Sequence, residues 1–295
     1  MKKIILSLFV IAMVAVLGVG LVACNNATPQ GQLANILSDH NQETFVYQAV
    51  NTKDDTTGVY TVKLRAYDKG SNVQFGSREL TNVSRGICIT GKLVFDDTVY
   101  EMGCYYNLIS GMSYMTPAYS FRNVKVDGKE KFDMQGEYAD GKFNCDYTTS
   151  ESGTLSDSDK VSGTVFDNNQ FQQVLRSVTT FSSGLSLAFT TPIVNAQGVT
   201  NANLTASGNS TAKVKDVLYV ENDESIKEDG IDCYVISISR STQVAGLSQT
   251  LYYAVDDVKC DGWGLKHVLV KIIEPFTFEG ERYEMQYKLI SASIS

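Results

Sequence analysis

FDDTVYEMGCYYNLIS, Phe95–Ser110, returns in shortened form near the C-terminal end of the sequence as FEGERYEMQYKLIS, Phe278–Ser291. Both copies read Phe, four residues, Tyr-Glu-Met and then Tyr-x-Leu-Ile-Ser, with two extra residues in the first copy. Two explanations stand: a chance likeness of two amphipathic hairpins, or a diverged internal duplication. Either one predicts a wide antiparallel sheet with one apolar face.

The apolar pattern fixes the register of the first hairpin. We expect a turn at Asp96-Asp97, with Cys88 on the outer face of the sheet and Cys104 on the inner face, so no disulfide should join them. A slip of one residue would set Lys92 against Tyr100, which the pattern forbids. The expected pairs are Phe95–Thr98, Leu93–Tyr100, Gly91–Met102, Ile89–Cys104 and Ile87–Tyr106.

The last hairpin follows the same rule around Glu279-Gly280. The expected pairs are Phe276–Tyr283, Ile272–Tyr287 and Val270–Leu289. Glu274 falls opposite Met285 and is the one misfit on this apolar face. Because Pro275 follows it, we expect a bulge that turns the carboxylate outward. A buried Glu274 would instead have a raised pKa and could orient a ligand head group.

The rest of the chain reads as strands with a few helices. Asp127-Gly128 and Asp140-Gly141 are hairpin turns, because both residues tolerate positive φ. Helical spacing occurs in residues 33–40, and again in residues 167–178 with Asp167 as N-cap. Residues 185–194 could be a short helix or a loop, and the small polar residues of 195–211 indicate a loop or linker.

The N-terminus predicts export and lipidation. Residues 1–23 combine Lys2 and Lys3 with an uncharged apolar run, as in a signal peptide, and Leu21-Val22-Ala23-Cys24 matches the bacterial lipobox. This match implies a diacylglyceryl group on Cys24. Residues 24–32 would be a polar tether, and residues 33–295 a β-rich domain on the outer face of the cell membrane. Two acyl chains hold a protein on a bilayer far better than one.

Charge excludes one class of partner. Removing residues 1–23 takes away two lysines and leaves 23 basic residues against 33 acidic ones, a formal charge of −10. Such a body is a poor nucleic-acid binder, because phosphate contacts need clustered Lys and Arg.

Signals of catalysis or metal binding are lacking. Five scattered cysteines remain after Cys24 without a Cys-x-x-Cys pair, so no zinc site is expected. His40 and His267 are the only histidines, and a structural role is expected for each. No nucleophile elbow, metalloprotease motif or phosphate loop occurs. We therefore expect no enzymatic activity, no cofactor and no metal.

A large sheet with one apolar face needs a second layer, and three short helices cover little of it. A curved sheet around amphipathic helices would leave an apolar cavity. The succession GIDCYVISISR, TLYYAVDD and LKHVLVKIIEPFTFEGERYEMQYKLIS resembles the LolA/LolB half-barrel family of lipoprotein carriers and its Gram-positive relatives. Gly230–Ile236 and Leu251–Asp257 match the rhythm of that family. The resemblance implies a half-barrel with helices on its concave side.

Two functions follow as hypotheses. The first is a lipid-anchored protein that binds a lipid or acyl chain in the concave face; the second is a non-enzymatic envelope sensor or accessory module with a packed core. Aromatic and Met side chains suit an apolar pocket. The candidate ligand-binding residues are Tyr100, Met102, Tyr106, Leu108, Phe171, Leu175, Phe276, Tyr283, Met285, Tyr287 and Leu289.

Overall fold

The computed structural model describes residues 37, 41–108, 115–178, 185–215, 217, 219–221, 224–225, 230–240, 249–260, 263–278 and 281–295. The expected signal peptide, Cys24, the tether and all of the expected helix 33–40 except Leu37 lie outside these residues. No helix in the described part of the chain has the length and apolar character needed to cross a membrane.

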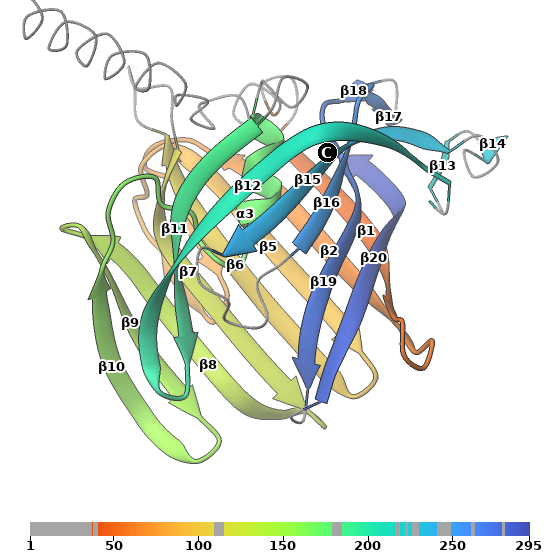
Figure 1. The fold of residues 1–295 in the computed structure, drawn as a ribbon. Helices are drawn as coiled ribbons and strands as arrows, with labels where there is room; N and C mark the ends of the chain where they lie inside the picture. The colour runs from red at the N-terminus through yellow and green to blue at the C-terminus, as the bar shows by residue number, and fades with distance from the viewer. Residues whose placement is uncertain are drawn as a thin grey trace, which may run out of the picture.

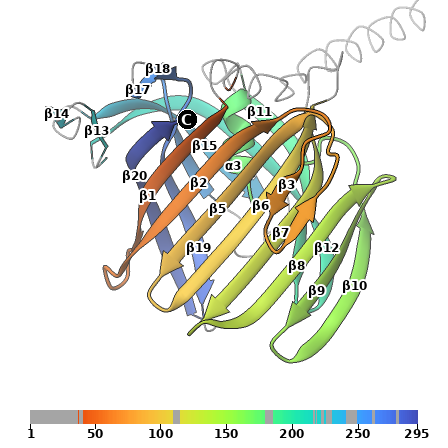
Figure 2. The ribbon, with the colours of Figure 1, turned by 180° about the vertical axis from the view of Figure 1, so that it is seen from behind.

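Most of the described chain is antiparallel β-sheet (Figures 1 and 2). The strands are β1 (Gln42–Asn51), β2 (Thr57–Tyr67), β3 (Val73–Phe75), β4 (Arg78–Leu80), β5 (Gly86–Phe95), β6 (Thr98–Leu108), β7 (Met115–Val126), β8 (Lys129–Ala139), β9 (Lys142–Thr149), β10 (Ser152–Lys160), β11 (Leu185–Asn195), β12 (Gly198–Val214), β13 (Val220–Glu221), β14 (Glu224–Ser225), β15 (Ile231–Arg240), β16 (Gln249–Ala254), β17 (Val258–Cys260), β18 (Trp263–Leu265), β19 (Leu269–Phe278) and β20 (Glu281–Ile294). One short helix, α3 (Phe171–Val174), continues into the 3-10 turn η1 (Leu175–Ser177).

Fourteen strands form one sheet in the order β10-β9-β8-β7-β6-β5-β2-β1-β20-β19-β16-β15-β12-β11. The predicted curved antiparallel sheet is thus confirmed, but it curls further than a half-barrel, into a nearly closed barrel (Figure 1). The predicted first-hairpin register is confirmed, from Phe95 opposite Thr98 to Ile87 opposite Tyr106. In the last hairpin Phe276 lies opposite Tyr283 and Ile272 opposite Tyr287, as predicted.

Side-chain contacts between the edge strand β10 and β12, together with a single bridge to the other edge strand, β11, close the barrel. The Val199 backbone N–H donates to Asp157 Oδ2 at 2.8 Å, and Asn201 Nδ2 donates to Asp159 Oδ2 at 2.7 Å. Beyond β10, Val165 forms an isolated parallel bridge with Thr190 of β11. The seam therefore lacks the continuous ladder that joins the other strands.

Two sequence expectations for residues 185–211 were wrong, because both stretches are strands. In β11 alternate residues Leu185, Leu187 and Phe189 are buried. In β12 the Asn, Thr and Ser residues resemble a loop in composition, but Ala202, Leu204 and Ala206 alternate with them and are buried. This period of two, together with pairing to β11 and β15, outweighs the loop-like composition.

The turns carry the expected backbone geometry. Asp127 and Asp140 have φ of 52°, and the glycines that follow them have φ of 70°. Asp96 has φ of 51° at the tip of the first hairpin. Positive φ at consecutive turn residues matches the twist of the flanking strands.

A short strap covers part of the outer face. The β3–β4 hairpin lies over β5–β7 (Figure 2), with the Phe75 and Phe121 rings 4.8 Å apart at 81°. Cys88 belongs to this outer cluster, whereas Cys104 belongs to the interior core. The two thiols thus lie on opposite faces and are free, as expected.

The helix fills one end of the barrel interior and is not amphipathic. Gln173, Arg176 and Ser177 are buried together with its apolar residues, so the expectation of amphipathic helices on a concave face was wrong. Asp167 is not the N-cap of α3, which is Gln170. Its side chain instead accepts from the Asn169 N–H at 2.9 Å, within the turn that precedes the helix.

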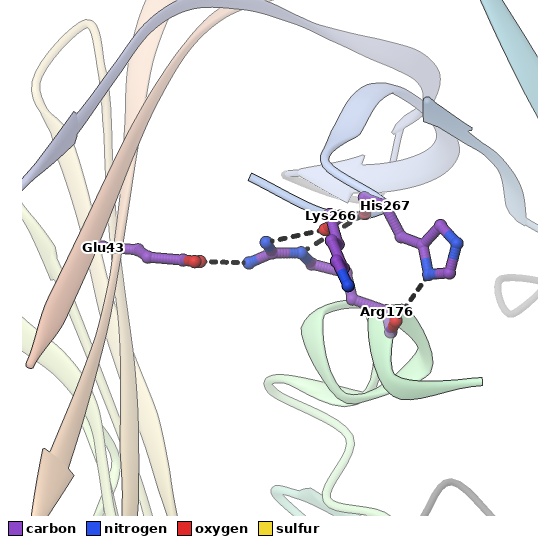
Figure 3. Close-up of polar contacts among 4 residues, drawn as sticks. All are labelled: Glu43, Arg176, Lys266 and His267. Atoms are coloured by element: carbon purple, nitrogen blue, oxygen red, sulfur yellow. Dashed lines mark hydrogen bonds and ion pairs between the residues drawn. The ribbon is translucent and has the colours of Figure 1, made fainter. Parts of the chain in front are cut away.

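A buried ion pair ties this helix to the barrel wall (Figure 3). Arg176 Nη1 lies 2.6 Å from Glu43 Oε2 of β1, and both side chains are fully buried. Arg176 Nη2 donates to the Lys266 carbonyl at 3.0 Å, and Nε donates to the His267 carbonyl at 3.3 Å. The guanidinium also lies 4.8 Å from the centre of the Phe45 ring. These contacts give the charge a full set of partners in a dry site.

We expect Arg176→Met to lower the free energy of unfolding by about 3–5 kcal/mol, because it leaves the Glu43 carboxylate buried without a counter-ion. The double variant Arg176→Met/Glu43→Met removes both charges and should recover at least about 2 kcal/mol of that loss. Urea unfolding of the full chain measures both values. If the effects of the two single substitutions simply add in the double variant, the ion pair has no such role.

Candidate ligand cavity

A cavity of about 310 Å³ lies inside the barrel, at the end opposite the buried ion pair. Leu93 and Tyr100 lie close to the β5–β6 turn, and Val124 and Phe132 lie close to the β7–β8 turn. The ion pair lies at the other end of the barrel, because Glu43 pairs with Ile294, at the end of β20 that is remote from the β19–β20 turn. The helix therefore occupies one end of the interior and the cavity the other. The lining residues are Tyr60, Leu93, Tyr100, Met102, Arg122, Val124, Phe132, Asn168, Asn169, Gln172, Gln249, Ile272, Glu274, Pro275 and Tyr287.

Three of the residues predicted to bind a ligand line this cavity: Tyr100, Met102 and Tyr287. Each of the two similar hairpins thus contributes a tyrosine to it. Five others lie buried in the core, namely Tyr106, Phe171, Leu175, Met285 and Leu289, and Leu108 packs against that core. Phe276 and Tyr283 are placed by their backbone pairing alone.

Aromatic rings connect the cavity to the core. The Tyr60 and Tyr287 rings are 5.4 Å apart in an edge-on arrangement, and Tyr47 follows 5.9 Å from Tyr60. Burial raises the pKa of Tyr60 and Tyr287 above the usual value, so both hydroxyls stay protonated at neutral pH. The neutral Tyr287 hydroxyl donates to Glu274, and the neutral Tyr60 hydroxyl can donate a hydrogen bond into the cavity.

Glu274 lies on the cavity wall, so the expectation that a bulge turns it outward was wrong. The β19–β20 register runs through Glu274–Met285 and Pro275–Glu284 without a shift. The carboxylate accepts from Gln249 Nε2 at 2.7 Å and is hydrogen-bonded with Tyr287. Burial raises the pKa of Glu274 from 4.5 to about 7, because the apolar surroundings disfavour its charged form.

Arg122 is the cationic group of the cavity. It projects from β7 and pairs across the strands with Met102 and Met134. Its guanidinium lies 4.6 Å from the centre of the Phe132 ring and donates to the Val194 carbonyl. Burial lowers the pKa of Arg122, although the group remains charged. Sequence reasoning missed this residue.

The helix α3 and the turn before it supply amides to the same cavity, Gln172 from the helix and Asn169 from the turn. Gln172 Nε2 donates to Gln249 Oε1 at 3.2 Å, which extends the Gln249–Glu274 contact into a chain of three side chains. Asn169 Nδ2 donates to Ser120 Oγ at 3.0 Å. Gln170 is fully buried behind this layer, and both of its side-chain polar atoms lack a hydrogen-bond partner. The amides were not predicted, because the sequence placed them in a longer helix.

A larger groove of about 490 Å³ lies outside the barrel, but its chemistry is different. Its wall is mostly polar and includes Arg78, Glu137 and Asp146. Within the described ranges no cluster of His, Cys, Asp and Glu could hold a metal ion. His267 Nδ1 makes a 3.1 Å contact with the Arg176 carbonyl, as a structural residue would. We therefore take the interior cavity as the candidate site.

Glu274→Gln should change how stability depends on pH. The wild-type carboxyl ionises at about pH 4.5 when unfolded and at about 7 when folded. The neutral Glu274 carboxyl therefore adds to the free energy of unfolding below pH 4.5, and this addition is lost as the pH rises to 7. We expect wild-type protein to lose about 1–2 kcal/mol more than Glu274→Gln across this window, after allowing for solvent screening.

Urea unfolding at several pH values measures this difference. Glu151→Gln, at an exposed residue of the β9–β10 turn, is the control and should follow the wild type. Parallel curves for wild type and Glu274→Gln would show that the carboxylate is solvated.

Comparisons with known proteins do not assign this chain to a family. No protein-family model and no curated protein match it. Among solved structures it is similar to the crystal structure of a beta-barrel-like protein of domain of unknown function DUF1849 from Brucella abortus. The TM-score is 0.44 and the sequence identity 10%, over 86% of this chain and 98% of that one. The LolA/LolB family expected from the sequence is not among these findings.

Proposed function

We propose that this protein is a lipid-anchored extracytoplasmic lipoprotein that binds a single-chain hydrophobic ligand, such as an acyl chain, inside its barrel. One observation carries the proposal: the interior keeps a cavity of about 310 Å³ beside the apolar side chains of Leu93, Met102 and Phe132. Ligand pockets of about 300–1,000 Å³ with mostly apolar walls and a few polar groups are typical of small-molecule sites.

The size of the cavity limits the ligand. Such a volume suits one medium-length chain and is too small for a diacyl lipid. Ile272 and Pro275 extend the apolar wall toward the opposite side of the barrel. The complex would be stabilised in proportion to the apolar area of the ligand that binding removes from water.

The proposal gives this chain no catalytic step, no cofactor and no nucleic-acid partner. Its partner is the membrane, through the acyl groups expected on Cys24. A second candidate function is an envelope sensor or accessory module. The packed end of the barrel favours it, because Phe171, Val174 and Leu175 fill that end without leaving room for a ligand.

Met102→Trp should fill part of the cavity and weaken acyl-chain binding at least tenfold. The half-buried Met102 side chain faces the cavity, so a bulkier ring occupies the space of the ligand. Native mass spectrometry and calorimetric titration with dodecanol, on the full chain carrying Cys24→Ser, measure binding.

Val94→Trp is the matched control. Val94 belongs to the neighbouring strand and its side chain lies on the outer face, 39% exposed. It should bind dodecanol like the parent chain. Equal binding by Met102→Trp would exclude the cavity as the site, and absence of binding by the parent chain would favour the sensor or accessory module.

Cys24→Ser should abolish lipidation. In a bacterial host fed an alkyne-labelled fatty acid, the unchanged chain should incorporate the label, whereas the variant should not. Cys88→Ser keeps the lipobox and should be labelled like the unchanged chain. Label on the Cys24→Ser chain would disprove the anchor.

A further inference from the structure

Two ionisable side chains from strands far apart in the sheet, Arg122 and Glu274, line the cavity. Arg122 lies on β7 and Glu274 on β19, and five strands separate them along the sheet: β6, β5, β2, β1 and β20. Both residues line the same cavity. Neither forms an ion pair with any described residue. Charged groups at apolar sites are costly to stability unless they are paired, so their placement calls for a partner.

Glu274 is already satisfied by the protein. Its carboxyl is held by Gln249 and Tyr287, and it accepts both contacts from neutral donors. The Arg122 guanidinium is not satisfied in the same way. The described residues take one of its N–H groups, through the Val194 carbonyl. A guanidinium carries five N–H donors and prefers a planar, two-oxygen acceptor.

The nearest relevant carboxylate does not fill this role. Asp167 influences Arg122 electrostatically but makes no ion pair with it. The Asp167 oxygens instead accept from the Tyr138 hydroxyl at 2.7 Å and from the Asn169 N–H at 2.9 Å. Arg122 therefore keeps N–H donors without an acceptor among the described residues, and it lines the cavity together with Met102, Val124 and Phe132.

We infer that the Arg122 guanidinium recognises the carboxylate of a single-chain amphiphile, whose hydrocarbon chain lies along Met102, Leu93 and Ile272 toward the Glu274 wall. This inference rests on the proposed function and adds the class of ligand, a fatty carboxylate. A bidentate guanidinium–carboxylate contact supplies orientation as well as affinity. The far wall suits a neutral chain end, because Glu274 is engaged with protein donors.

Three probes of equal chain length test the inference: dodecanoate, methyl dodecanoate and dodecylammonium. They are titrated into the full chain carrying Cys24→Ser, so that no acyl group on the protein itself competes. We expect dodecanoate to bind at least tenfold more tightly than the methyl ester, and dodecylammonium to bind most weakly. Equal binding of dodecanoate and its ester would overturn the inference and leave the proposed function intact. Binding of none of the probes would overturn both.

Substitutions locate the preference. Arg122→Gln should weaken dodecanoate binding at least tenfold and leave methyl dodecanoate within twofold, so the preference disappears. Arg122→Lys keeps the charge but not the planar fork and should retain part of the preference. Arg65→Gln, at an exposed arginine on β2, is the control and should change nothing.

Two results would contradict the assignment. If Arg122→Gln weakens all three probes equally, Arg122 shapes the cavity and does not read the head group. If the parent chain prefers dodecylammonium, Glu274 is the recognition group. Because the probe preference of the parent chain is itself a test, a variant that fails to fold does not remove it.

Discussion

Fourteen strands curled into a nearly closed barrel enclose more space than their inward-facing side chains can fill, because barrel diameter grows with the number of strands. The chain meets this constraint unevenly. At one end the helix and its preceding turn enter the interior, and most of their residues are buried there. At the other end none of the elements in the described ranges enters, and the cavity lined by Tyr60, Met102 and Arg122 remains.

This helix is unusually polar for the interior of a barrel, because it contributes an arginine and two glutamines. Glu43 and the carbonyls of residues 266 and 267 match the guanidinium. The β1 strand, the helix and the β18–β19 connection are thereby fixed to one another, although they are far apart in sequence. The same helix borders the cavity through Gln172, whose amide donates to Gln249.

Local sequence patterns predict the walls of this barrel well. The period of two in the hairpins at Phe95 and Phe278 is enough to set strand register, because a slip by one residue reverses the faces. The same patterns fail where composition misleads. The strand from Gly198 to Val214 is rich in Asn, Thr and Ser and resembles a loop, and only its alternate Ala and Leu positions reveal the sheet.

The site was harder to predict than the walls, for a physical reason. Tyr100, Met102 and Tyr287 follow the alternating pattern of the two hairpins, and the sequence predicted them. Arg122 shares the inward parity of Val124, yet a charge at such a position is usually assigned to the solvent side. Asn169 and Gln172 reach the cavity along a path that only the closed barrel defines, so no local signal could place them.

The free edge of the sheet has a further consequence for how copies of this protein behave side by side. β10 reads SGTLSDSDK and is exposed along most of its length, with carboxylates and a lysine where a flat apolar edge would invite another chain. Two of those carboxylates already engage the strand across the seam. The opposite edge, β11, is bridged by residue 165. A neighbouring copy of this barrel thus meets charged, exposed side chains at the β10 edge in place of a flat apolar strand, which disfavours intermolecular strand addition, the usual route by which open sheets aggregate.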